Sequence, residues 1–368
     1  MRTPPVILAI DAFLEYVSAT PSWEASSHRR GTGTFTIHIQ EFECSMKIGR
    51  IYLMELRYGV QVCPAMCTLS AGSNLTQRTG SPEKIDLVVT LGGDGTILHA
   101  SSLFSAGAVP PVLSFSMGTL GFLLPFHIDD FDKALESVFS GKATILNRMR
   151  LACTFYDKEL AKKGKDGDGE DRLVLSLDIF PEFSPDWQVM NEIALHRGSS
   201  PHLNTIDIFV DGQHLTEAVS DGLIVSTPTG STAYSLSAGG PIVHPSLSAL
   251  VLTPICPRSL SFRPLVFPSS SIITLRIGDR SRAPAGISMD GRSSHTLHPG
   301  ESVVVQASPY PVPCINRSSI ITSTDVENMR QSEGAGPGKE DDWVRDINNL
   351  LQYNATFRSK ALLRHSRT

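Results

Sequence analysis

A run of β-forming residues ends at adjacent glycines and restarts at once with helical spacing. Residues 85–90 read Ile-Asp-Leu-Val-Val-Thr, and residues 96–104 repeat apolar positions as a helix does. This order predicts a buried strand, a tight turn and a helix N-terminus. Glycines let a ligand approach the backbone, and the free N–H groups of a first helical turn attract anions, so the turn predicts a phosphate site. Its candidate phosphate-binding residues are Gly92, Gly93, Gly95 and Thr96.

Asp94 lies in the middle of this turn, where its carboxylate would repel phosphate. Two roles would offset the repulsion: the carboxylate holds a cation, or it accepts a proton from a hydroxyl group that is being phosphorylated. Either role implies phosphoryl chemistry. The turn lacks the Gly-Lys-Ser/Thr of a Walker A loop and the GxGxxG of a Rossmann turn. A structural alternative, in which Asp94 only caps its own helix, stays open.

The composition is that of an ordinary globular protein. The 368 residues are 41% hydrophobic and 19% charged, which suits a full core and two domains. The net charge of −5 argues against a nucleic acid or an anionic membrane as the main partner, and no apolar run approaches the roughly 18 residues of a membrane span. The six cysteines form no disulfide framework and no targeting segment is convincing, so we expect a cytoplasmic location.

Strands and helices alternate in the first half of the chain. A second buried strand is expected at residues 112–115, and an amphipathic helix at residues 128–139. Such alternation predicts a parallel sheet with sites at the carboxyl ends of its strands. The turns at residues 92–96 and 116–122 should therefore face one crevice. Residues 1 to about 80 show no clear strand–helix rhythm.

After Arg150 the pattern changes to short strands. Asp211-Gly212 and Asp290-Gly291 supply hairpin turns, and together the runs predict a mostly antiparallel, sandwich-like second domain. The charged stretch at residues 162–171 is expected to be a solvated loop. The expected strands are residues 172–180, 188–195, 205–210, 215–219, 222–226, 272–277, 286–289 and 302–306.

Two polar residues, Asn191 and Glu192, interrupt an apolar run in this domain. Consecutive residues of a strand point to opposite faces, so at least one of the two must face the interior or a cleft. A role in ligand binding would explain the pair. The structural alternative is a buried polar group that hydrogen-bonds the backbone.

A second polar stretch runs from Ser220 to Ser235 and predicts a strand, a turn dense in hydroxyls and a helix of small residues. Hydroxyls and helix N–H groups would form a donor-rich wall for sugar and phosphate oxygens, and Tyr234 adds a ring for stacking. A turn that merely caps its own helix would explain two or three of these hydroxyls, but not so many in one run.

In this order, the stretches resemble those of the NAD kinase family. The Asp221 to Tyr234 run is highly specific, whereas GGDG is shared with lipid kinases and phosphofructokinases. Residues 253–264 look like the eukaryotic branch, and residues 343–365 look fungal. The residues that carry the resemblance are Gly92 to Thr96, Gly118 to Phe122, Asn191-Glu192 and Asp221 to Tyr234.

The resemblance implies ATP-dependent phosphorylation of the adenosine ribose 2′-hydroxyl of NAD, or of NADH, with Mg²⁺. It implies a Rossmann-like α/β domain that carries the GGDG loop, a β-sandwich-like domain, an active site between the two, and a homo-oligomer. Asp94 would be the base at the hydroxyl group. The implied dinucleotide-binding residues are Gly95, Phe122, Asn191, Glu192, Asp221, Thr232, Ala233 and Tyr234.

The chain should divide into five parts, and two alternative functions remain open. One is a non-catalytic NAD(P)-binding sensor, motivated by the unclear N-terminal region. The other is a lipid kinase of the diacylglycerol or sphingosine type, motivated by GGDG beside a β-rich domain. The expected parts are an atypical region partly in the α/β domain (1–83), the α/β domain (84–148), a β-rich dinucleotide-binding domain (149–330), a linker (331–341) and a helical tail (342–368).

Overall fold

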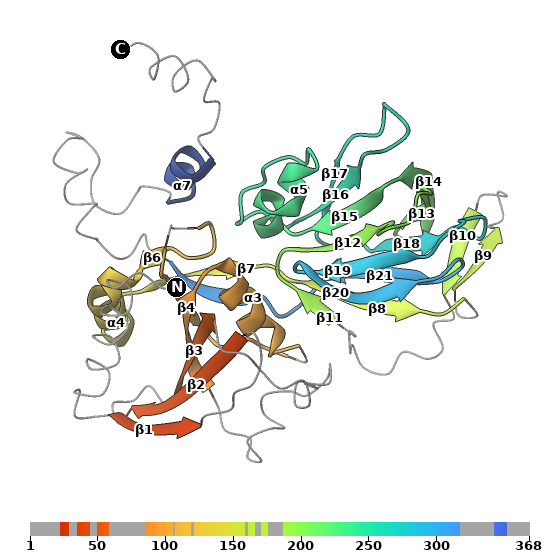
Figure 1. Cartoon of the computed structure of the whole chain (residues 1–368). Helices are drawn as coiled ribbons and strands as arrows, with labels where there is room; N and C mark the ends of the chain where they lie inside the picture. The colour runs from red at the N-terminus through yellow and green to blue at the C-terminus, as the bar shows by residue number, and fades with distance from the viewer. Residues whose placement is uncertain are drawn as a thin grey trace, which may run out of the picture.

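Three sheets in two bodies make up the part of the chain that the structure describes (Figure 1). This computed structural model describes residues 23–28, 35–44, 50–58, 85–105, 107–118, 121–158, 161–165, 171–175, 187–316 and 342–351. The first sheet forms an α/β body, and the other two sheets form a β-rich body. Among the described residues, no helix is both long enough and apolar enough to span a membrane.

The sheet of the α/β body has the order β1-β2-β3-β4-β5-β22-β7, with β6 beside β5. The pairs β3–β4, β4–β5 and β5–β22 are parallel, whereas β1, β2 and β3 form an antiparallel meander. The described part of residues 1–58 thus extends the parallel sheet through β3. The strands are β1 Trp23–His28, β2 Phe35–Cys44, β3 Arg50–Tyr58, β4 Ile85–Gly92, β5 Val112–Ser116, β6 Phe126–His127, β7 Thr144–Arg148 and β22 Val312–Asn316.

Helices cover both faces of this sheet. Successive residues of β4 point to opposite faces, so this strand contributes to two apolar cores. Leu87 and Val89 pack in the core that includes Leu135 of α4 (Phe131–Phe139), and Val88 packs with Ile97 of α3 (Asp94–Ser102). The strands expected at residues 85–90 and 112–115 and the helix after GGDG are confirmed. The second expected helix is also present, preceded by a 3₁₀ turn, η2 (Ile128–Asp130).

The β-rich body consists of two antiparallel sheets that share one core, as predicted. Their orders are β11-β8-β21-β18-β13-β14-β10-β9 and β17-β16-β15-β12-β19-β20. Leu275 from the first and Val225 from the second belong to the same buried cluster. The strands are β8 Leu151–Tyr156, β9 Ala161–Lys165, β10 Asp171–Leu175, β11 Trp187–Val189, β12 Glu192–His196, β13 Asn204–Val210, β14 Gln213–Ser220, β15 Gly222–Ser226, β16 Ala249–Ile255, β17 Leu265–Pro268, β18 Ile273–Ile277, β19 Ala285–Met289, β20 Arg292–Leu297 and β21 Ser302–Ala307.

The two Asp-Gly turns are confirmed as hairpin turns. Asp211 and Gly212 have φ of 52° and 81°, and Asp290 and Gly291 have φ of 48° and 74°. Two successive positive φ angles define a type I′ turn, whose twist matches that of the strands it joins. These turns fix the registers of the β13–β14 and β19–β20 hairpins.

Two local predictions in this body are wrong. Residues 162–171 do not form a single loop, because β9 ends in Lys165 and pairs with β10. Its lysines are compatible with a strand at a sheet edge, where charge discourages further pairing. The run at residues 188–195 is two strands in different sheets, β11 and β12.

The strand, turn and helix expected in the hydroxyl-rich stretch are present. They are β15, the 3₁₀ turn η4 (Thr229–Thr232) and the short helix α5 (Tyr234–Ser237).

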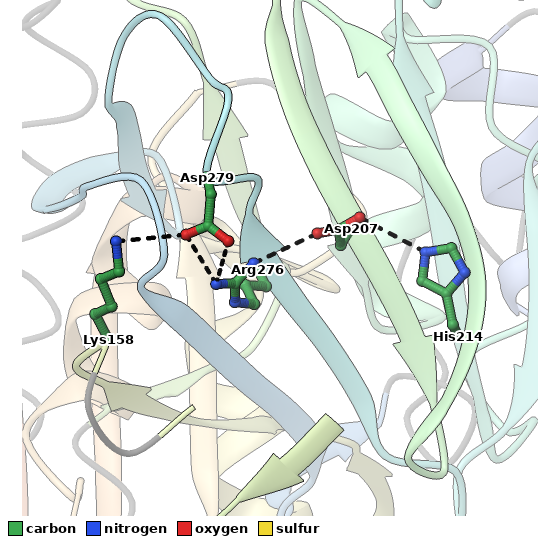
Figure 2. Close-up of polar contacts among 5 residues, drawn as sticks. All are labelled: Lys158, Asp207, His214, Arg276 and Asp279. Atoms are coloured by element: carbon green, nitrogen blue, oxygen red, sulfur yellow. Dashed lines mark hydrogen bonds and ion pairs between the residues drawn. The ribbon is translucent and has the colours of Figure 1, made fainter. Parts of the chain in front are cut away.

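Four charged side chains of alternating sign, together with His214, form a row on the first sheet of the β-rich body (Figure 2). Asp207 on β13 lies opposite Arg276 on β18, with 3.6 Å between carboxylate and guanidinium, and both side chains are about 95% buried. His214 lies 3.6 Å from Asp207 on the other side. Asp279 accepts two bonds of 3.0 Å from Arg276, which lowers the pKa of that carboxyl, and Lys158 lies 3.5 Å away. Each buried charge is therefore paired, as a dry site requires.

Candidate functional site

The GGDG turn presents open backbone at the start of α3. A Cβ on Gly92 would lie 2.2 Å from the hydroxyl of Thr96, so only glycine fits there. A Cβ on Gly93 or Gly95 would meet nothing within 4 Å, so a ligand has room beside these residues. Thr96 is buried, and its N–H donates to the carbonyl of Gly93 over 2.8 Å. The exposed part of the predicted phosphate site is thus the backbone of residues 93–95.

The second turn reaches the carboxylate of Asp94. A Cβ on Gly121 would lie 2.6 Å from Oδ1 of Asp94, and the N–H of Leu123 donates to the same carboxylate. Gly92 pairs with Ser116 across β4 and β5, so the two turns share one edge of the sheet, as predicted. Partial loss of hydration raises the pKa of Asp94, against the opposing charge of Arg148 and the Leu123 N–H.

Arg148, at the end of β7, connects the two bodies beside this carboxylate. Its guanidinium donates to the carbonyl of Phe122 over 2.9 Å and to the hydroxyl of Thr229 over 3.2 Å. Phe122 belongs to the α/β body and Thr229 to η4 of the β-rich body. Sequence reasoning missed Arg148, because its partners lie 26 and 81 residues away and no local motif marks it.

Asn191 lies in the break between β11 and β12, Glu192 is the first residue of β12, and Asp290 holds this backbone in place. The carboxylate of Asp290 accepts N–H groups from Met190, Asn191 and Glu192 over 2.9, 2.7 and 3.3 Å. The same residue forms the left-handed turn between β19 and β20. The sequence indicated only the turn, so this second role of Asp290 was missed.

Both side chains of the Asn-Glu pair are buried, with exposed fractions of 8% and 6%. Oδ1 of Asn191 and Oε2 of Glu192 have no hydrogen-bond partner among the described residues. Burial, and then the charge of Asp290, raises the pKa of Glu192 to about 7, and the N–H of Tyr234 opposes the rise. Buried acceptors normally have donors, so these two oxygens favour ligand binding over the structural alternative.

Most hydroxyls of the polar run bond within the protein instead of forming a free wall. Thr227 donates to the carbonyl of Met190, and Ser235 bonds Thr253. Ser231 donates to Pro228 and Thr232 to Thr229, both within the turn. Such capping within the turn accounts for few of the hydroxyls, as expected, and others bond separate segments, as Thr227 and Ser235 do. The hydroxyls of the inner residues serve to shape the turn.

A cleft of about 170 Å³ lies between the two bodies. One wall comes from the α/β body, the second from η4 and the segment after it, and the third from the C-terminal helix α7 (Asp342–Leu351). Of the predicted site residues, Phe122 and Thr232 line it. The cleft is also lined by Arg148, Thr229, His244, Trp343 and Asp346.

The remaining predicted residues fall into two groups. Ala233 and Tyr234 lie next to η4, and the N–H of Tyr234 donates to the carboxyl group of Glu192. Asp221 lies apart from them. Asp221 precedes Gly222, at the opposite end of β15 from Ser226, which pairs with Glu192. At roughly 3.3 Å per strand residue, that places Asp221 about 16 Å from the pair. Its carboxylate pairs with Arg197 over 2.8 Å.

No group of three or more His, Cys, Asp or Glu side chains in the described ranges could hold a metal ion. Asp94 offers a single carboxylate beside open backbone. This donor set suits Mg²⁺ that arrives with phosphate groups and keeps most of its waters, since that ion needs only one or two protein carboxylates.

Two domain families match the chain, one on each body. The family described as the ATP-NAD kinase N-terminal domain matches residues 51–143, and the ATP-NAD kinase C-terminal domain matches residues 190–317. Together they cover more than half of the chain. The chain belongs to the ATP-NAD kinase family. The resemblance inferred from the sequence is confirmed, and the lipid-kinase alternative is left without support.

Relatives within the ATP-NAD kinase family are known from fungi. The chain is 43% identical over 286 residues to the mitochondrial NADH kinase pos5 of Schizosaccharomyces pombe, covering 77% of this chain and 63% of that protein. It is 43% identical over 296 residues to the mitochondrial NADH kinase POS5 of Saccharomyces cerevisiae, covering 75% and 64%. The chain thus spans a little under two thirds of each.

A solved member of the family supports the fold. The crystal structure of yeast NADH kinase complexed with NADH matches with a TM-score of 0.58 and 40% identity, over 75% of this chain and 69% of that one. The expected combination of an α/β part and a β-sandwich-like part is confirmed.

Proposed function

We propose that this chain transfers the γ-phosphoryl group of ATP to the 2′-hydroxyl of the adenosine ribose of NAD or NADH, giving NADP or NADPH. One observation carries the proposal. The carboxylate of Asp94 stands at the start of α3, beside Arg148, which joins its body to the turn at Thr229. In a member of the ATP-NAD kinase family, this arrangement sets a proton acceptor beside a cleft between two bodies.

Asp94 is proposed to orient the attacking hydroxyl and to accept its proton late in the transfer. Phosphoryl transfer depends mainly on positioning and on charge stabilisation, so the protein needs a fixed acceptor more than a strong base. The N–H of Leu123 and the absence of a side chain at Gly121 fix the carboxylate. Its raised pKa makes it a better proton acceptor than an ordinary aspartate.

The backbone of Gly93 and Gly95 is proposed to receive phosphate oxygens. The N–H groups of a first helical turn have no partner within the helix, and the helix dipole adds a favourable field. Open space at both glycines leaves room for this approach. Mg²⁺ bound with ATP would neutralise phosphate charge, and Asp94 is the side chain placed to hold it.

Asn191 and Glu192 are proposed to hold the dinucleotide on the opposite side. The free oxygens of both side chains are acceptors, and the donors of a dinucleotide are its ribose hydroxyls and its amino and amide groups. Phe122, Thr232, Ala233 and Tyr234 would complete this binding surface, in keeping with the family resemblance.

We also propose a homo-oligomer, which the family resemblance implies. In such an assembly, Asp221, which lies about 16 Å from Glu192 at roughly 3.3 Å per strand residue, is proposed to contact the dinucleotide of a second copy of the chain. Light scattering after size exclusion tests the assembly. Mixing Asp94→Asn with Asp221→Asn chains tests the sharing: restored activity supports it, and additive loss rejects it.

The enzymatic proposal is tested by incubating the purified chain with ATP, Mg²⁺ and either NAD or NADH. NADP(H) is detected with a dehydrogenase specific for it, and EDTA should abolish the signal. Binding of dinucleotide without any NADP(H) would favour the sensor alternative.

The expected cytoplasmic location stays a prediction. Since the names of both fungal relatives place those proteins in mitochondria, fractionation of cells that express the tagged chain should decide it.

A further inference from the structure

We propose that the C-terminal helix α7 forms a functional wall of the substrate cleft and that its residue Trp343 positions the hydroxyl-rich turn. The inference rests on the proposed function and deepens it. In Figure 1, α7 lies above β6 and β7, level with α5. Trp343 and Asp346 both line the cleft, although α7 lies outside the two ranges matched by the domain families.

The contact that carries the inference joins Trp343 to His244. The two rings meet edge to face, with 4.7 Å between centroids and an angle of 67° between planes. This is a favourable geometry for two aromatic groups. His244 lines the cleft as well, so the contact lies at the cleft and not behind it.

Hydrogen bonds connect the backbone next to His244 to the hydroxyl-rich turn. The N–H of its neighbour Val243 donates to the hydroxyl of Ser231 over 2.9 Å, and that hydroxyl also lies 2.6 Å from the carbonyl of Pro228. Ser231 is fully buried between Thr229 and Thr232, both of which line the cleft. Moving His244 would therefore displace the side chains that face the ligand.

The turn is thus braced from two directions. Arg148 holds Thr229 from the α/β body, and Trp343 supports His244 from α7. On the helix, Ile347 is buried one turn after Trp343, whereas Val344 is 53% exposed. A side chain on the outer face of α7 therefore serves as a matched control.

Because Trp343 supports the turn through His244, whereas Gly121 and Leu123 fix Asp94, loss of Trp343 should weaken dinucleotide binding more than it slows phosphoryl transfer. Trp343→Ala should raise KM for NAD about tenfold, which corresponds to the free energy of one aromatic pair. Its kcat should stay within about twofold of the wild-type value. KM for ATP should stay constant. Trp343→Phe keeps an aromatic edge and should recover most of the affinity, and Val344→Ala should match the wild type.

A binding measurement separates this inference from the proposed reaction. The chain has three tryptophans, and the emission of Trp343 should change as NAD fills the cleft of Asp94→Asn protein, a change that Trp343→Phe should abolish. If the wild type binds NAD without turnover, weaker binding by Trp343→Ala still supports the role of α7 while the kinase proposal fails. Equal affinity of folded Trp343→Ala and Val344→Ala, or a loss confined to kcat, would overturn the inference.

Discussion

Nε of Arg150 donates to the carbonyl of Tyr310 over 2.6 Å, and this bond ties together the two connections that run between the α/β body and the β-rich body. The same guanidinium donates to the carbonyls of Phe104 and Gly107, just after the helix that begins with Asp94. Arg150 is fully buried, and burial lowers its pKa to about 10, so it remains charged at neutral pH. One cation therefore holds the segment after α3 against the two connections between the bodies.

Replacing Arg150 by methionine should cost about 3–5 kcal/mol of unfolding free energy, because the carbonyls of Tyr310, Phe104 and Gly107 each lose a bond from a fully buried, charged donor. Urea unfolding measures the loss. Arg263→Met is the matched control, since that exposed arginine donates to one carbonyl and should change stability by less than about 0.5 kcal/mol. A loss below about 1 kcal/mol for Arg150→Met would argue against this bridging role of Arg150.

Gly121→Ala should lower kcat about a hundredfold, because the added Cβ would displace a reacting group by about an ångström. That Cβ would lie 2.6 Å from Oδ1 of Asp94. Gly118→Ala, in the same turn, would meet nothing within 4 Å and should keep kcat within about twofold of the wild type. Steady-state kinetics on both folded variants makes the comparison, and equal kcat values would refute the positioning of Asp94 by this turn.

Asp94→Asn should abolish turnover and leave NAD binding within about tenfold, since the amide cannot accept the proton. Titration calorimetry measures the binding. In the wild type the active form is the carboxylate, so kcat/KM should fall on acidification, with a midpoint above the ordinary aspartate range because the pKa of Asp94 is raised. Residual turnover near the wild-type level would eliminate Asp94 as the acceptor.

Glu192→Gln should stabilise the protein at pH 8 but not at pH 5. The folded-state pKa of Glu192 is raised from 4.5 to about 7, so its contribution to stability is full below pH 4.5 and is lost as the pH rises through 7. The loss approaches about 3 kcal/mol at 1.36 kcal/mol per pKa unit. Urea unfolding of both proteins at both pH values isolates the difference, and a gap that does not vary with pH would contradict it.

Elements that local chemistry specifies could be predicted from the sequence. The two glycines before Asp94 stop β4 and start α3, and the Asp-Gly pairs at 211–212 and 290–291 make type I′ turns. By contrast, β16 contains Pro254, which weakens a strand pattern, and β9 contains three lysines. Their pairing partners, and not their own residues, make them strands.

The site was predictable where a motif marked it and not where distant residues meet. Asp94, Asn191 and Glu192 could be found from their neighbours in the sequence. Arg148 and Asp290 could not, because each acts on partners tens of residues away. Only the folded chain reveals that the carboxylate of Asp290 sets the backbone of the Asn-Glu pair.

The place of β22 in the first sheet has a consequence for synthesis on the ribosome. This strand, Val312–Asn316, lies between β5 and β7, so the sheet of the α/β body lacks an internal strand until residue 316 has been made. Both sheets of the β-rich body end by Ala307 and need no later segment for pairing. Although domains usually fold from the N-terminus onward during translation, here the body that begins second should be finished first. A chain still on the ribosome would then carry a completed β-rich body beside an α/β body that lacks one strand.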